Sequence, residues 1–236
     1  MKAMIFAAGF GTRLQPLTSN TPKALVKVKK RPMLDWVIDR LVQYGVNEII
    51  INTHYLHEEI QAYIQLHQYP VPISISYEET ILGTGCGLYQ TRHFWDNSDF
   101  FICNVDILCD ANLDLFFEYH KSHAAAVSLA VNEKVSTSML LVDQQGALVG
   151  RSIAGERQLL KTPEGVIKEV GFCGLQTISP LFFSQIKLPM SFSIIDDYMN
   201  LLRAGASVMT WSIGDAYWED IGTPETVAKA NREFPG

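Results

Sequence analysis

Short apolar runs of strand length alternate along this chain with segments whose apolar residues recur at helical spacing. This alternation is typical of a mostly parallel sheet with helices on its faces, because parallel strands need crossover connections that are usually helical. The chain has 236 residues, 47% of them hydrophobic and 19% charged, a balance typical of a globular protein with a full core. We therefore predict an α/β fold in which residues 1–236 form a single domain.

The individual patterns predict where strands and helices lie. Residues 140–153 read as a β-hairpin turning at Gly146 and laid onto the parallel core. The apolar runs predict strands over residues 3–8, 46–52, 73–77, 100–105, 125–131 and 208–212. The helical spacing predicts helices over residues 32–44, 58–66, 88–94 and 113–123.

Charge and cysteine usage exclude several classes of protein. The formal net charge of -6 argues against a protein that holds nucleic acid by neutralising phosphates. The four cysteines form no CxxC pair and no small-domain disulfide framework, which predicts buried thiols in a reducing cytoplasm. Glycines and Arg13 interrupt the first apolar run before it could span a membrane. The six histidines are scattered, and we expect them at the surface rather than in a metal site.

A glycine-containing loop, AAGFGTRLQPLTSNTPKAL, follows the first predicted strand at residues 7–25. Gly9 and Gly11 permit a turn whose N–H groups converge on phosphate oxygens, and Arg13 and Lys23 add positive charge. Two glycines alone would also fit an ordinary turn with solvated basic residues. The third glycine of the dinucleotide fingerprint is replaced by Leu14, and the Walker pattern is absent, so the loop is a phosphate binder of another type.

The pattern GxGTRLxPLT followed by TPK resembles the signature of sugar-1-phosphate nucleotidylyltransferases. The resemblance implies a single Rossmann-like α/β/α domain in which the hairpin lies over the sugar pocket. It also implies that Gly11, Thr12 and Arg13 wrap the triphosphate of an NTP, and that Lys23 bridges the reacting phosphates. The other residues that it places in the nucleotide site are Ala8, Gly9 and Asn104.

Two aspartates are candidate metal ligands. Asp106 follows the strand FFICNV, at the sheet edge where open α/β folds bind ligands, and Asp220 lies in YWEDIGTPETV, where Pro224 can begin a helix. The resemblance implies that both carboxylates hold Mg²⁺, which takes one or two protein carboxylates and completes its shell with phosphate and water. Without the resemblance, Asp106 could simply cap a turn and Asp220 a helix.

Two further stretches resemble the base and sugar pockets of that family. Gly83, in ETILGTGCGL, would let the backbone approach a nucleobase; the alternative is a helix start without a ligand. Glu169 and Gly171, in EVGFCGLQTISP, and Asn132 would contact the sugar, although each also fits a core strand. The family's common EKP form is absent here, which leaves the identity of the sugar open.

The predicted reaction joins an NTP and a sugar 1-phosphate into an NDP-sugar and pyrophosphate. The chain most resembles the small N-acetylmuramate 1-phosphate uridylyltransferases of cell-wall metabolism, which implies UTP and an N-acetylmuramate or N-acetylhexosamine 1-phosphate. Alternatives are a mannose or heptose 1-phosphate guanylyltransferase, a phosphocholine cytidylyltransferase and, in another class, an inactive nucleotide-sugar sensor. An NAD-linked enzyme is disfavoured. We expect a cytoplasmic monomer or small homo-oligomer without nucleic-acid or membrane partners.

Overall fold

A computed structural model describes the chain in three stretches, residues 1–133, 139–186 and 191–236. Contacts within the chain divide it into two compact units. The first unit consists of Met1–Leu82, Phe100–Ala111 and Ala216–Gly236, and the second of Gly83–Asp99 and Asn112–Asp215. The prediction of a single domain stays a prediction, since compact units can belong to one domain or to two.

The first unit contains a four-stranded parallel sheet in the order β6-β1-β4-β5. Its central strands β1 and β4 are almost entirely buried, which explains their continuous apolar sequences. The four strands are β1 (Lys2–Phe6), β4 (Glu48–Thr53), β5 (Ile73–Tyr77) and β6 (Phe100–Asn104). In parallel register the carboxyl ends of all four lie at one edge, which is the usual ligand edge of such sheets.

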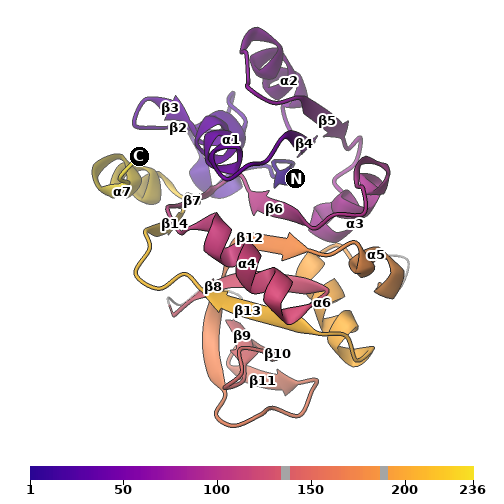
Figure 1. The fold of residues 1–236 in the computed structure, drawn as a ribbon. Coiled ribbons are helices and arrows are strands. Elements are labelled where there is room, and N and C mark those ends of the chain that lie inside the picture. The colour runs from indigo at the N-terminus through magenta and orange to yellow at the C-terminus, as the bar shows by residue number, and fades with distance from the viewer. Residues whose placement is uncertain (134–138, 187–190) are drawn as a thin grey trace. The chain divides into compact units, whose positions relative to one another are not determined.

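Three helices and two small sheets complete the first unit. The helices are α1 (Met33–Gln43), α2 (His57–Leu66) and α7 (Pro224–Glu233), and the small sheets pair β2 (Lys27–Val28) with β3 (Arg31–Pro32) and β7 (Ile107–Cys109) with β14 (Trp218–Asp220). Figure 1 shows α7, at the yellow C-terminal end, beside β2 and β3. A shared apolar cluster holds these parts together and consists of Leu14, Val26, Val28, Met33, Leu108, Ile221, Val227, Ala230 and Phe234.

The second unit contains a six-stranded mixed sheet in the order β11-β10-β9-β12-β8-β13. Only β8 and β13 pair in parallel within it, among the described residues. Its strands are β8 (Val127–Asn132), β9 (Met139–Val142), β10 (Leu148–Ile153), β11 (Glu156–Leu159), β12 (Lys168–Ile178) and β13 (Val208–Ser212). Its helices are α3 (Gly83–Gln90), α4 (Leu113–His123), α5 (Leu181–Gln185) and α6 (Ile194–Arg203).

The structure confirms the α/β prediction and most of its elements. β5, β13 and α4 have the predicted bounds, and β9 and β10 form the predicted hairpin. Two predictions were wrong. A helix was expected over residues 88–94, but α3 ends at Gln90 and a separate 3₁₀ turn, η3, covers Arg92–Phe94. His120 was expected at the surface but is 2% exposed, because its side chain extends from α4 to Ser128 on β8.

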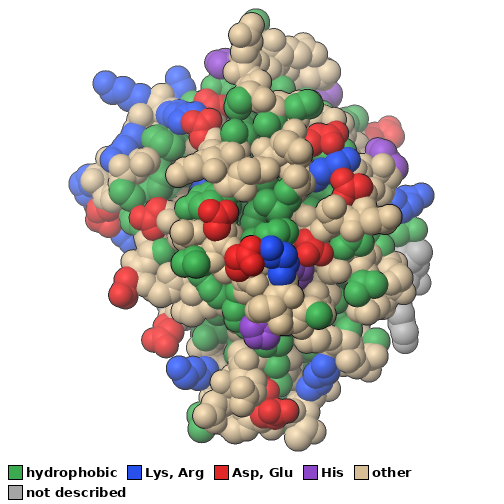
Figure 2. All heavy atoms as spheres, viewed as in Figure 1, with side chains coloured by type: hydrophobic (Ala, Val, Ile, Leu, Met, Phe, Trp, Pro, Cys, Tyr) green, Lys and Arg blue, Asp and Glu red, His purple; other side chains and the backbone are tan. Residues whose placement is uncertain are grey.

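Other expectations concern the surface and the thiols. All four cysteines lie in the described residues and none of them forms a disulfide; Cys103, Cys109 and Cys173 are buried and Cys86 is half-buried. On the face shown in Figure 2, acidic and basic side chains are interspersed. In the described part of the chain, no helix has the length and apolar character needed to cross a bilayer.

Candidate active site

The glycine loop begins where β1 ends, at the ligand edge of the parallel sheet. Gly11 has a φ of 65°, a left-handed conformation that glycine adopts without steric cost. Its carbonyl oxygen accepts hydrogen bonds from the Leu14 N–H at 2.9 Å and from the buried Thr18 hydroxyl at 2.7 Å. Leu14 belongs to the apolar cluster of the first unit. The loop is therefore fixed by both a backbone turn and a core residue.

Gly11 also makes room for the residues that surround it. A Cβ atom at this position would lie 2.9 Å from Thr18 Cγ2 and 3.2 Å from Lys23 Cβ. Gly9 differs, because a Cβ there would meet nothing within 4 Å. The two glycines of the loop are thus explained differently. Packing within the protein requires a glycine at position 11, whereas no described residue occupies the space beside Gly9.

Lys23 begins a second short turn, η2 (Lys23–Leu25), and its ammonium group forms an ion pair with the Asp106 carboxylate. The two side chains are 13% and 19% exposed, so the pair is largely shielded from water. The structure therefore brings together two candidate site residues that lie far apart in the sequence.

Asp220 is held next to this pair by the two-stranded sheet of β7 and β14. In its register Asp220 lies opposite Ile107, and the Ile221 N–H donates to the Asp106 carbonyl oxygen at 2.8 Å. At the other end of the ladder the Tyr217 N–H donates to the Asp110 carboxylate at 2.7 Å. Main-chain hydrogen bonds thus place the two candidate metal ligands side by side.

Arg13 completes the cluster from the glycine loop. One of its guanidinium nitrogens lies 3.7 Å from Asp220 Oδ2, and both side chains are partly exposed. The guanidinium group packs over Gly222, where a Cβ atom would come within 2.9 Å of it. Gly222 therefore leaves the space that Arg13 occupies.

The electrostatics of Asp220 reflect these neighbours. Burial raises the pKa of its carboxyl group, and the nearby negative charge of Asp106 raises that pKa further. The positive charges of Lys23 and Arg13 act in the opposite direction. One oxygen, Asp220 Oδ1, is buried and has no hydrogen-bond partner among the described residues. Such an oxygen is costly to bury without a ligand.

These groups fit a hard divalent cation. Asp106 and Asp220 supply adjacent carboxylates, and the unsatisfied Asp220 oxygen could be satisfied by a cation. Within the described residues no cluster of three or more acidic, histidine or cysteine side chains is placed to hold a metal. Two carboxylates are the number that Mg²⁺ commonly takes from a protein when phosphates and water supply the rest. The magnesium assignment remains a prediction that the donor set permits.

The residues predicted to contact the sugar lie in the second unit. Gly171 on β12 pairs directly with Asn132 on β8, so the structure brings these two together. Glu169 lies on the same strand and accepts a hydrogen bond from Arg157 at 2.6 Å. Their contact with a sugar stays a prediction.

Gly83, the predicted base contact, has a φ of 74° and begins α3. A Cβ atom there would collide with the Phe192 carbonyl oxygen. This close packing already accounts for a glycine at the position, and its contact with a nucleobase stays a prediction.

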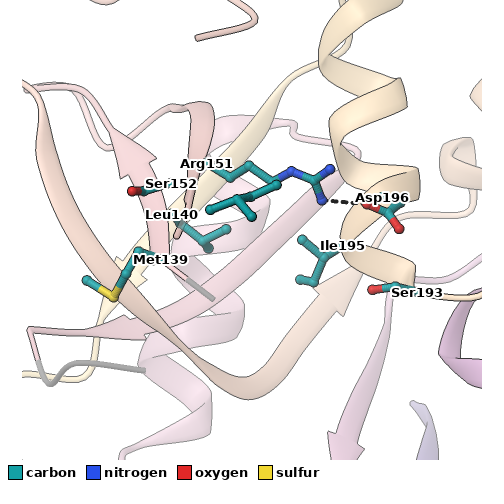
Figure 3. Close-up of a pocket in the computed structure, with 8 residues that line it drawn as sticks. Met139, Leu140, Arg151, Ser152, Ser193, Ile195 and Asp196 are labelled. Carbon is teal, nitrogen blue, oxygen red and sulfur yellow. Dashed lines mark hydrogen bonds and ion pairs between the residues drawn. The ribbon is translucent and has the colours of Figure 1, made fainter. Parts of the chain in front are cut away.

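The second unit also contains a pocket of about 220 Å³ beside the β9–β10 hairpin. Figure 3 shows Arg151 reaching from β10 across this pocket to Asp196 at the start of α6, where the two side chains form an ion pair. Ser152, Ser193 and Ile195 also line it. Because Asp196 neutralises Arg151, the lining residues that the structure describes carry no unbalanced charge that would select an ionic ligand.

Sequence reasoning missed two buried polar residues at the ligand edge, Asn52 and Glu78, which are 2% and 1% exposed. Asn52 accepts a hydrogen bond from the Ala7 N–H at 2.9 Å and donates to Glu78 at 2.7 Å. A signal was present, because Asn52 ends one predicted strand and Glu78 directly follows another. Polar residues at the ends of adjacent parallel strands meet at the same edge.

Comparison with known proteins identifies a family and several relatives of this chain. A family model described as Nucleotidyl transferase matches residues 2–138. The catalytic subunit beta of mannose-1-phosphate guanylyltransferase from Dictyostelium discoideum is 28% identical over 229 residues, covering 95% of this chain and 62% of that protein. The mannose-1-phosphate guanyltransferase of Candida albicans is 30% identical over 233 residues, with the same two coverages. The chain thus spans less than two thirds of the length of these relatives.

Among solved structures, HddC from Yersinia pseudotuberculosis complexed with GMP-PN is similar, with a TM-score of 0.77 and 22% identity. The likeness covers 99% of both chains. At this level of identity the comparison supports the fold, independently of the details of either site.

Proposed function

We propose, from the premise that this chain belongs to the nucleotidyl transferase family, that it transfers a nucleotidyl group from an NTP to a sugar 1-phosphate. The observation that carries the proposal is the cluster of Lys23, Asp106, Asp220 and Arg13 beside the glycine loop. It combines cationic groups for phosphate oxygens with a pair of carboxylates for a divalent cation. The cluster argues against a nucleotide-sugar sensor that has lost catalysis.

In the proposed reaction a phosphate oxygen of the sugar 1-phosphate attacks the α-phosphorus of the NTP. The new oxygen–phosphorus bond forms as the bond to the β-phosphate breaks, and pyrophosphate leaves with the bonding electron pair. The nucleophile is already ionised, so no general base is required. Lys23 and Arg13 would stabilise the charge that develops on the attacked phosphate and on pyrophosphate.

The glycine loop would hold the triphosphate through backbone N–H groups around Gly9 and Gly11. Asp106 and Asp220 would hold Mg²⁺, which when bound supplies charge neutralisation for the phosphates. The ion pair between Lys23 and Asp106 keeps the ammonium group in position before the substrate binds. Holding both substrates in line removes much of the entropic part of the barrier.

For the substrates, the relatives favour the guanylyltransferase alternative over UTP with N-acetylmuramate 1-phosphate. Two curated relatives are named for mannose 1-phosphate and a guanylyl group. We therefore take GTP and mannose 1-phosphate as the leading pair. The N-acetylmuramate, N-acetylhexosamine, heptose and phosphocholine substrates remain as alternatives for the test.

The test is a matrix of the common NTPs against these phosphate acceptors, read out by pyrophosphate release with magnesium present. The highest kcat/KM is expected for GTP with mannose 1-phosphate, and the Asp106→Asn variant should remove that signal. Nucleotide binding without pyrophosphate release for any pair would instead indicate a sensor. A different best pair would keep the reaction class and change the substrate assignment.

A further inference from the structure

A largely buried chain of hydrogen bonds links the glycine loop, through Asn52 on β4, to segment 78–82 at the ligand edge of the first unit. It begins at the Ala7 N–H, which opens the glycine loop and donates to Asn52 Oδ1 at 2.9 Å. Asn52 Nδ2 then donates to Glu78 Oε1 at 2.7 Å. The other oxygen, Glu78 Oε2, accepts from the Leu82 N–H at 2.8 Å. We call these four residues the Asn52–Glu78 bridge.

The Asn52–Glu78 bridge has a fixed polarity. The Ala7 and Leu82 N–H groups can only donate, and an ionised Glu78 carboxylate can only accept. Asn52 fits between them because its amide has an acceptor oxygen on one side and a donor NH₂ group on the other, and the two neighbours determine which way it points. Every hydrogen bond in the bridge is therefore satisfied in a single arrangement. A buried network of this kind rigidifies its surroundings when it is complete.

A second connection joins the same loops along an independent route. The ring of Phe10, between the two glycines of the loop, packs edge-on against His54 with centroids 5.3 Å apart. His54 Nδ1 lies 2.8 Å from the Glu78 carbonyl oxygen, and because that oxygen only accepts, Nδ1 must be the donor. The Glu78 N–H in turn donates to the Thr53 carbonyl at 2.8 Å. Residue 78 is thus fixed through both its side chain and its main chain.

Glu78 is too deeply buried to serve as a substrate contact, at 1% exposure. A carboxylate is costly to bury unless its partners make use of its charge and geometry. Through Asn52 and directly, Glu78 joins the start of the glycine loop to the end of segment 78–82, which leads directly into Gly83. The geometry is that of a support that fixes one loop relative to another.

We propose that Asn52 and Glu78 are positioning residues that hold segment 78–82 in register with the glycine loop, so that an NTP is bound through its nucleoside and its triphosphate together. This inference rests on the proposed nucleotidyl transfer and adds the residues that couple the two halves of nucleotide recognition. Neither residue touches the substrate; both act through the loops that they join.

The bridge can be tested by exchanging its polarity. In Glu78→Gln, a side-chain amide must face both the Asn52 amide and the Leu82 N–H, so two donors oppose each other in every orientation. In Asn52→Asp, two carboxylate oxygens face each other instead. The double variant Asn52→Asp/Glu78→Gln restores all hydrogen bonds with the net charge of the unchanged protein. In that variant the carboxylate at position 52 accepts from the Ala7 N–H and from the amide at position 78.

The measurement compares binding of the best NTP with binding of inorganic tripolyphosphate, which lacks a nucleoside, in the presence of magnesium. Each single variant should weaken NTP binding by about tenfold, because it leaves one buried pair of hydrogen-bonding groups as two donors or two acceptors. Tripolyphosphate binding should weaken less. The double variant should regain the NTP preference. Glu58→Gln, an exposed carboxylate on α2, is the matched control and should behave as the unchanged protein.

Equal weakening of both ligands in the single variants would overturn the proposal, since it would indicate a purely structural role. A double variant that is no better than the singles would also overturn it. If the singles do not fold, a folded double variant with the NTP preference intact supports the bridge, and an unfolded one contradicts it. Absence of turnover in the unchanged protein would instead refute the proposed function. The binding measurements on the bridge variants do not depend on turnover, so the two proposals can fail separately.

Discussion

The main-chain N–H of Ile221 donates to the main-chain oxygen of Asp106 at 2.8 Å, and this bond sets the distance between the two candidate metal ligands. The adjacent ladder of β7 and β14 extends the contact through Asp220 and Ile107. Because the ligands are positioned by backbone hydrogen bonds, their separation does not depend on side-chain rotamers alone. Conservative changes of either carboxylate should therefore alter chemistry without altering the local fold.

Replacing Lys23 by methionine should lower kcat by about 100- to 1,000-fold, the usual cost of losing one donor to developing charge. Methionine keeps most of the length of the side chain and removes the ammonium group. Lys27→Met on β2, an exposed lysine near the same loop in sequence, is the matched control. Steady-state pyrophosphate release measures both. Turnover by Lys23→Met equal to that of the control would remove Lys23 from the mechanism.

Magnesium should raise the midpoint of thermal unfolding of the unchanged protein, because the proposed site of Asp106 and Asp220 would bind it in the folded state only. At about 100 times its Kd the expected gain is about 2.7 kcal/mol, or roughly 5–10 °C for a chain of this size. The double variant Asp106→Asn/Asp220→Asn should show no such shift, while Asp215→Asn, an exposed carboxylate, should retain it. Equal shifts in all three proteins would place the cation elsewhere.

Excess EDTA should also abolish turnover.

Gly9→Ala and Gly11→Ala should separate the two roles of the glycine loop. Gly11→Ala should cost about 1–3 kcal/mol of stability, because alanine is strained at a φ of 65° and its Cβ would crowd Thr18. Gly9→Ala should leave the unfolding midpoint unchanged, since the space beside it is open, yet weaken NTP binding. Denaturant unfolding and nucleotide titration measure the two effects. If Gly9→Ala binds NTP normally, the phosphate does not approach that residue.

His120 should make the stability of the fold dependent on pH. Burial lowers its pKa from the ordinary value of 6.5, although Asp99 partly opposes that shift. Between the lowered pKa and 6.5 the unfolded chain binds more protons than the folded one, so the contribution of His120 is complete above pH 6.5 and is lost as pH falls through the lowered pKa.

The free energy of unfolding, measured by urea titration over this range, should therefore fall less steeply with acidification in His120→Gln than in the unchanged protein. His123→Gln, on the same helix but exposed, should keep the original slope. Equal slopes in all three proteins would mean that folding does not lower the pKa of His120.

Much of the first unit could be predicted from local pattern, whereas the candidate site residues were identified from motifs that resemble those of a known family, and their roles stay predictions. The parallel strands are buried on both faces and therefore read as apolar runs, and Asp106 and Asp220 lie in motifs with a recognisable order. The short strands β2, β3, β7 and β14 could not be predicted, because two or three residues carry no periodicity. Yet β7 and β14 are what bring the carboxylates together.

The remaining errors have tertiary causes. α3 begins in GTGCG, a sequence with low helix propensity, and contacts with residues 191–192 and α6 stabilise it there. His120 looks like a surface residue in its sequence, and its burial follows from a partner on β8, Ser128, whose hydroxyl lies 2.8 Å from the ring. Similarly, the roles of Asn52 and Glu78 depend on which N–H groups reach them, which no local pattern reveals.

The pairing of β7 with β14 has a consequence for how the protein is made. A growing chain on the ribosome synthesises the glycine loop, Lys23 and Asp106 long before residues 218–220 leave the exit tunnel. Until then β7 has no β14 to pair with, and Asp106 stands beside Lys23 without its second carboxylate. The proposed cation site thus acquires its second carboxylate only after every residue of the second unit has been translated.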